Sequence, residues 1–124
     1  MDITPIVPAD RQLIQGYGDG HFRISGRQHQ GSVIVFPERT LAWAVADPVA
    51  ITRATLAAVT ASDAKVEILL IGTGRKASLI GAELRQALRA HRIVVETMDT
   101  GAACRTYNVL LAEERRVAAA LIAV

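Results

Sequence analysis

Residues 93–108 read IVVETMDTGAACRTYN, and the change of pattern within this stretch decides the fold. The segment 93–98 is apolar and β-branched, which is typical of a buried strand. From Thr100 to residue 115, Ala103, Tyr107 and Leu110 recur on one side, which indicates a helix. A buried strand that runs straight into a helix is characteristic of layered α/β domains.

The rest of the second half continues this alternation. VEILLIG (66–72) is a near-continuous apolar run, as expected for a strand buried in a parallel sheet, and VAAALIAV (117–124) also favours a strand. Residues 79–91 carry apolar side chains at helical spacing, and Thr52 is a good N-cap for a helix that ends near Ser62. The sequence predicts an α/β domain with helices covering a largely parallel sheet.

The first half has the character of strands. We expect strands at 21–25, 32–36 and 41–46, separated by polar turns at 25–31 and 37–40. Successive strands joined by short turns form a β-meander. The length of 124 residues is that of one domain, so residues 1–124 are expected to form a single unit.

Composition limits the classes of function. The formal charge is only +2, and the arginines are interleaved with glutamates rather than gathered in a stripe, so nucleic-acid binding is not expected. The single cysteine fits a reducing compartment. The N-terminal segment MDITPIVPAD lacks the basic start and apolar core of a secretory signal. No apolar run reaches the ~20 residues that a transmembrane helix needs, so we expect a cytoplasmic protein.

A glycine-rich loop follows the strand at 66–72. Gly72, Gly74 and Ala77 satisfy the pattern G-x-G-x-x-G/A, and Glu96 ends the next strand. This spacing occurs in dinucleotide-binding domains, where the glycines let the backbone approach a pyrophosphate. The same residues also suit a tight turn after a buried strand. The neighbouring cations Arg75 and Lys76 favour a phosphate or carboxylate if the loop binds an anion.

Cys104 also allows two interpretations. If Thr100 caps the helix, Cys104 lies in its first turn, where the helix dipole and Arg105 would stabilise a thiolate. Free cysteine is also among the most buried residue types and behaves as a small hydrophobic residue, and this interpretation is the favoured one. The three histidines are scattered and have no metal-ligand spacing, so no catalytic residue, metal or cofactor is assigned.

Three segments resemble the Mth-like family of domains of unknown function. The first is 97–123, which contains MDTGAACRTYN. The other two are 17–37 (YGDGHFRISGRQHQGSVIVFP) and 69–76 (LLIGTGRK). This family includes the mitochondrial complex I assembly factor 3 group and an adipogenesis-associated protein. Two departures stand out: Glu114 occupies a position where the family often has glycine, and 77–84 lacks its aromatic and proline residues.

The resemblance implies a three-layer α/β domain, the Mth-like fold, with a mixed, mostly parallel central sheet, helices on its faces and an N-terminal β-meander. It implies no established enzymatic activity. It implies protein partners, among them the machinery that assembles or exports membrane complexes, and a location peripheral to the inner membrane.

These observations give a leading hypothesis and an alternative. The leading hypothesis is a non-enzymatic interaction or assembly factor with a cleft between the loop and the helix start. The residues expected to line it are Gly72, Thr73, Gly74, Arg75, Lys76, Asp99, Thr100, Cys104, Arg105 and Tyr107. The alternative is a protein that binds a small molecule or an anion such as a nucleotide or phosphate, or a thiol enzyme, using the loop and Cys104.

Overall fold

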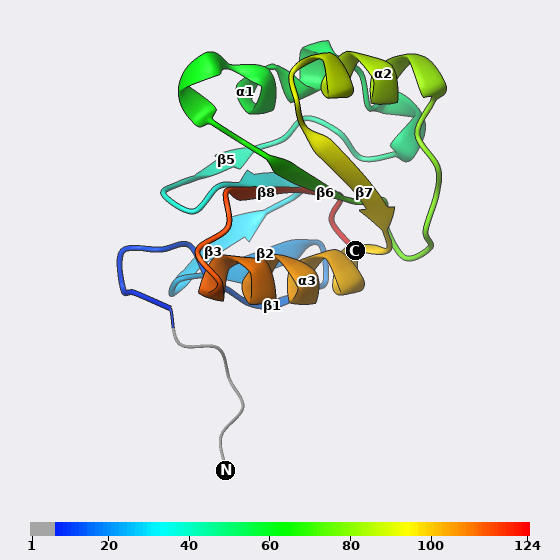
Figure 1. The fold of residues 1–124 in the computed structure, drawn as a ribbon. Coiled ribbons are helices and arrows are strands. Elements are labelled where there is room, and N and C mark those ends of the chain that lie inside the picture. The colour runs from blue at the N-terminus through cyan, green and yellow to red at the C-terminus, as the bar shows by residue number, and fades with distance from the viewer. Residues whose placement is uncertain (1–6) are drawn as a thin grey trace.

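A computed structural model describes residues 7–124 and contains two sheets (Figure 1). The larger sheet has five strands in the order β5-β4-β8-β6-β7. Their bounds are Val33–Val35 (β4), Thr40–Ala42 (β5), Ile68–Gly72 (β6), Val94–Met98 (β7) and Val117–Leu121 (β8). The expectation about a secretory signal concerns in part residues 1–6, which lie outside the described residues.

The larger sheet is mixed. Strand β6 is parallel to both β7 and β8, whereas β4 is antiparallel to both β5 and β8. The expectation of a mostly parallel sheet therefore holds only for the β8-β6-β7 part. Strands β4 and β5 are joined by a short turn, and a short turn allows only antiparallel pairing.

The meander differs from the one expected. It consists of β1 (Ile14–Gly18), β2 (His21–Ile24) and β3 (Arg27–Gln30). The segment 25–31, expected to be a turn, contains β3, and the expected strand at 32–36 contributes β4 to the larger sheet instead. The expected strand at 41–46 is wrong in its bounds, since β5 begins at Thr40, within the expected turn, and ends at Ala42. Strand β3 has the sequence RQHQ and is mostly exposed, so it lacks the apolar alternation by which strands are recognised.

Three α-helices cover the larger sheet: α1 (Ala57–Thr60), α2 (Ala82–Ala90) and α3 (Thr100–Ala112). The helix expected from Thr52 to Ser62 is broken into α1 and short 3-10 turns at Ala54–Leu56 and Ser62–Ala64. Arg53 rather than Thr52 directly precedes the first 3-10 turn, but the Thr52 hydroxyl accepts a hydrogen bond from the Thr55 amide at 3.2 Å.

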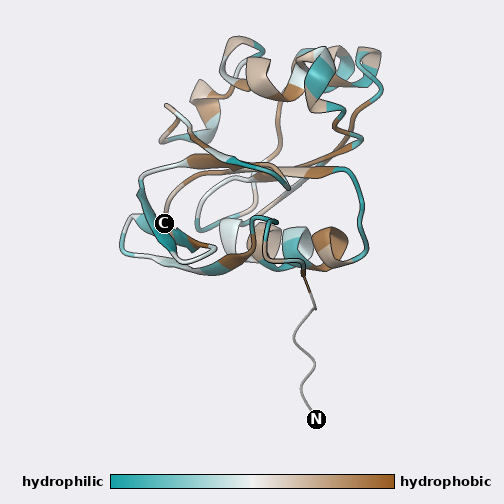
Figure 2. Cartoon of the chain, turned by 90° about the vertical axis from the view of Figure 1, so that its left-hand side faces the viewer, coloured by the Kyte–Doolittle hydropathy of each residue, from teal (hydrophilic) through white to brown (hydrophobic). Residues whose placement is uncertain are grey.

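The larger sheet lies between α1 and α2 on one face and α3 with the meander on the other (Figure 1). Many of the hydrophobic ribbon segments lie in this central sheet (Figure 2). Leu69 and Ile71 of β6 pack toward α2, whereas Leu70 packs toward α3. Strand β8 is fully buried: Val117, Ala119 and Leu121 face α3, whereas Ala118 and Ala120 face α1 and α2.

Strand β7 corrects one expectation. It lies at the edge of the sheet, and Val94 and Glu96 are exposed. The segment 93–98 was expected to be a buried strand because its apolar residues are continuous. Ile93 and Val95 pack toward α2, whereas Val94 and Glu96 point to the opposite face and lie outside the core around α3, so this half of the pattern faces solvent.

Candidate functional site

The parallel strands bring the two predicted segments to one edge of the sheet. Gly72 of β6 lies in register with Met98 of β7 and Leu121 of β8, which are the last residues of their strands. The loop 73–81 and the start of α3 therefore leave the sheet at the same carboxyl edge, as expected. Open α/β sheets usually place their binding sites at this edge.

Thr100 joins the loop to the helix. Its side chain is fully buried, and its Oγ1 accepts a hydrogen bond from the Gly74 amide at 3.0 Å and donates one to the Ile122 carbonyl at 2.8 Å. Its backbone amide donates to the Gly74 carbonyl at 2.8 Å. One threonine thus connects the ends of β6 and β8 to the first turn of α3.

The expected cleft between the loop and the helix start is filled at this point. A β-carbon on Gly72 would lie 2.9 Å from the Thr100 Cα and 3.0 Å from the Leu121 Cδ2. Such distances are too short for any residue larger than glycine without a shift of backbone. The two segments touch each other, and their exposed side chains project from the joined structure.

The loop itself is a compact turn. The Thr73 hydroxyl donates to the Lys76 carbonyl at 2.8 Å and accepts from the Ser78 amide at 2.9 Å. Gly74 has φ of 105°, a backbone conformation that favours glycine. Its amide is already bonded to Thr100, and α2 begins only at Ala82. These features support the interpretation as a turn over that of a phosphate-binding loop at a helix N-terminus.

Asp99, rather than Thr100, caps α3. Its carboxylate accepts a hydrogen bond from the Ala102 amide at 2.9 Å, and Thr100 is the first helical residue. Cys104 therefore lies in the second turn, where its side chain is 2% exposed. Burial raises the pKa of the Cys104 thiol to about 12, although Arg105 partly opposes this shift. The structure thus supports the interpretation of Cys104 as a small buried hydrophobic residue.

Tyr107 anchors α3 to the segment before β1. Its hydroxyl donates a hydrogen bond to the Gln12 carbonyl at 2.8 Å, and burial raises the pKa of the phenol. The neighbouring Asn108 side chain bonds both the amide and the carbonyl of Ile14, at 3.0 and 2.7 Å. These contacts hold the meander against α3 and give both side chains a structural role.

Three of the predicted site residues are exposed: Arg75, Lys76 and Arg105. The structure adds two hydrophobic side chains at the same edge, Tyr17 and Leu79, which are 43% and 87% exposed. We call these five residues the carboxyl-edge surface. Leu79 was missed because it stands at the start of the periodic pattern 79–91, whereas the helix begins only at Ala82.

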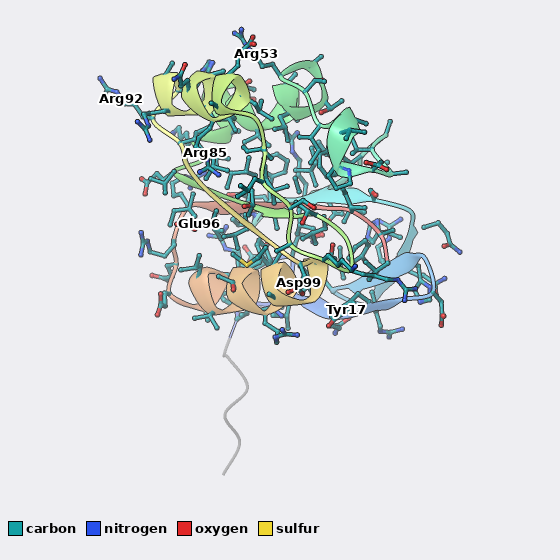
Figure 3. The ribbon with its side chains drawn as sticks, turned by 90° about the vertical axis from the view of Figure 1, so that its right-hand side faces the viewer. Tyr17, Arg53, Arg85, Arg92, Glu96 and Asp99 are labelled. Carbon is teal, nitrogen blue, oxygen red and sulfur yellow. The ribbon has the colours of Figure 1, made fainter. Side chains whose placement is uncertain are left out.

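Tyr17 comes from the meander but lies at the start of α3, close to Asp99 (Figure 3). The Tyr17 hydroxyl lies 3.4 Å from the Arg105 Nη1. A β-carbon at Gly101 would lie 2.5 Å from the same hydroxyl oxygen, so glycine leaves room for the tyrosine ring over the helix. The carboxyl-edge surface is thus built from segments that are far apart in the sequence.

Residues 7–124 contain neither a metal-binding cluster nor a membrane-spanning helix. No group of three or more histidine, cysteine, aspartate or glutamate side chains is arranged to hold a metal ion. No helix in this part of the chain combines the length and hydrophobicity that crossing a bilayer requires.

Comparison with known proteins identifies the family. The model of a family described as protein of unknown function (DUF498/DUF598) matches residues 14–122. The chain belongs to this family. The Mth-like resemblance of the sequence is thereby confirmed.

Named relatives fall into two groups. An uncharacterised protein of Rhodobacter capsulatus is 39% identical over 109 residues, which cover 88% of this chain and 82% of that protein. Proteins named NADH dehydrogenase [ubiquinone] 1 alpha subcomplex assembly factor 3 are 34% identical in Danio rerio and 32% identical in Homo sapiens. The matches cover 89% and 92% of this chain but 63% and 62% of those proteins.

Solved structures share the fold. A crystal structure from Bartonella henselae, described as an outer membrane protein, has a TM-score of 0.86 at 42% identity and covers 96% of this chain and 99% of that one. A solution structure from Bordetella pertussis, described as a Mth938-like domain, has a TM-score of 0.82 at 32% identity and covers 98% and 92%.

Substitution of Thr100 by valine tests the junction between the loop and α3. Valine keeps the shape of threonine but leaves the Gly74 amide and the Ile122 carbonyl without their side-chain partner. We expect the free energy of unfolding in urea to fall by about 2–4 kcal/mol. In the control Thr106→Val, the lost contact is one 3.6 Å approach of the hydroxyl to the Met98 sulfur, and the loss should stay below about 1 kcal/mol. Equal losses in the two variants would contradict this role of Thr100.

The burial of Cys104 predicts a slow thiol. At pH 8 the native protein should react with iodoacetamide about a thousandfold more slowly than the protein unfolded in urea, because little thiolate forms and access is blocked. Mass spectrometry of the alkylated protein measures both rates. Native alkylation at the rate of the unfolded protein would instead indicate an accessible, ionised cysteine.

Proposed function

We propose that this chain is a non-catalytic interaction protein that assists the assembly of a membrane-bound respiratory complex. The observation that carries the proposal is the carboxyl-edge surface, in which three exposed cations accompany two exposed hydrophobic side chains on a hydrogen-bonded support. The relatives named as complex I assembly factor 3 supply the class of target. We place the protein in the cytoplasm, peripheral to the inner membrane, without nucleic-acid partners or a cofactor.

The composition of the carboxyl-edge surface suits a protein partner. Arginine and tyrosine are enriched at the centres of interfaces, and Arg105 lies beside Tyr17. Leu79 exposes 87% of its surface and directly follows the turn that the Thr73 hydroxyl closes with Lys76 and Ser78. Covering an exposed leucine with a partner removes apolar surface from water, which is favourable.

The alternative is binding of a small anion by the same edge. It is favoured by Arg75 and Lys76, which are exposed next to a glycine turn. It is opposed by the Gly74 amide, which is bonded to Thr100 and therefore does not point at a phosphate. A thiol enzyme is supported less, because Cys104 is buried and protonated at neutral pH.

The double substitution Arg75→Ala and Arg105→Ala tests the proposal. Both side chains are exposed, so the variant should unfold at nearly the same temperature as the wild type. Loss of two interface arginines at about 1 kcal/mol each should lower the recovery of membrane-complex subunits with the tagged protein by roughly tenfold or more. Quantitative mass spectrometry of the material bound from solubilised membranes measures this recovery.

The matched control is Arg23→Ala with Arg27→Ala, which removes two exposed arginines from the meander. It should recover the same subunits as the wild type. If the folded Arg75→Ala, Arg105→Ala variant recovers these subunits as well as the wild type does, the carboxyl-edge surface is not the binding surface.

A further inference from the structure

A second surface with its own chemistry lies along β7. This strand ends the larger sheet and pairs only with β6. The Val94 amide donates a hydrogen bond to the Glu67 carbonyl, and the Met98 carbonyl accepts one from the Thr73 amide. The backbone groups of residues 94 and 98 therefore face β6. Backbone groups alternate in direction along a parallel ladder, so those of Val95 and Thr97 face the open side.

Three arginines stand beside this open edge. Arg85, Arg89 and Arg92 are spaced i, i+4 and i+7 along α2 and the turn after it, and we call them the arginine row. They line a cavity of about 270 Å³ together with Ile93, Val94 and Val95. Arg85 and Arg92 lie on the same side of the molecule, with Arg85 between α2 and β7 (Figure 3).

Within residues 7–124 no ion pair is formed by the arginine row. The ion pairs formed in that part of the chain are those of Arg11 and Arg116 with Glu38, at 3.4 and 3.9 Å. The polar contact recorded for Arg85 is a hydrogen bond from its Nη1 to the Val95 carbonyl at 3.2 Å. Three neighbouring cations repel one another, so an anionic group brought from outside would stabilise them.

We propose that β7 and the arginine row bind an extended acidic segment of a protein partner, which adds to the sheet as a further strand. The outward backbone groups of Val95 and Thr97 supply the pairing. Carboxylates on the side of the segment that faces α2 meet the arginine row, and Arg85 exchanges its bond with Val95 for one with a carboxylate. Charge-assisted bonds of this kind are stronger than bonds between neutral groups.

Period-two alternation defines the partner further. Side chains on the other face of the added strand would lie beside Val94, which is 59% exposed, and Glu96. That face should therefore be apolar and free of acidic residues. A second copy of this chain is a poor occupant, because pairing β7 with β7 would bring two arginine rows together. This inference rests on the proposed function in assuming a protein partner, but it uses a different surface.

The test is an NMR titration with a designed probe. The probe is a nonapeptide with glutamate at alternate positions and valine and threonine between them, and the matched peptide has glutamine in place of glutamate. We expect saturable shifts centred on the Val95 and Thr97 amides, with slower hydrogen exchange there. The glutamine peptide should bind about tenfold more weakly, because it cannot form charge-assisted bonds with the arginine row.

Variants separate the arginine row from other positive charge. Arg85→Gln with Arg89→Gln should weaken binding of the glutamate peptide about tenfold, whereas Arg23→Gln with Arg27→Gln on the meander should leave it unchanged. The Arg75→Ala, Arg105→Ala variant should bind the peptide like the wild type. This variant therefore distinguishes loss of binding at β7 from loss of binding at the carboxyl-edge surface, on which the proposed function depends.

Three results would overturn the proposal. One is the absence of saturable shifts at Val95 and Thr97 up to millimolar peptide. Another is equal affinity for the glutamate and glutamine peptides. The third is self-association of the Arg85→Gln, Arg89→Gln variant with unchanged peptide affinity, which would show that Arg85 serves only to block the edge.

Discussion

The buried hydroxyl of Thr100 is the contact on which the rest of this structure depends. It accepts from the amide of Gly74 and donates to the carbonyl of Ile122, so it joins the ends of β6 and β8 to the first turn of α3. Gly72 makes this possible, because any β-carbon there would meet the Thr100 backbone. Once α3 is fixed in this way, Tyr107 and Asn108 hold the meander against it.

This arrangement divides the residues of the carboxyl edge into two kinds. Thr73, Gly74 and Thr100 are buried, and their polar groups bond one another, so they form the support. Arg75 and Arg105 project from that support into solvent. Buried polar groups that already have hydrogen-bond partners inside the protein are not available to bind a ligand. Exposed cations on a fixed backbone can bind a partner with little loss of conformational entropy.

Local pattern predicted the second half of the chain well, since β6, α2, β7, α3 and β8 all lie within the expected segments. It failed for β3, whose polar sequence carries no alternation. It assigned the site residues by their position after buried strands, which placed Arg75 and Arg105 correctly at the edge. It could not separate the buried Cys104 from an exposed thiol, nor find Tyr17, because both depend on how α3 packs against distant strands.

Native-state hydrogen exchange of the Gly74 amide shows whether the loop and the start of α3 form one rigid unit with the core of the sheet. A hydrogen bond to a buried threonine should open only when the protein unfolds globally. We expect Gly74 to exchange with the same free energy of opening as Ala119 in the fully buried strand β8. Exchange of Gly74 at the rate of an exposed loop amide such as Lys76 would contradict this expectation.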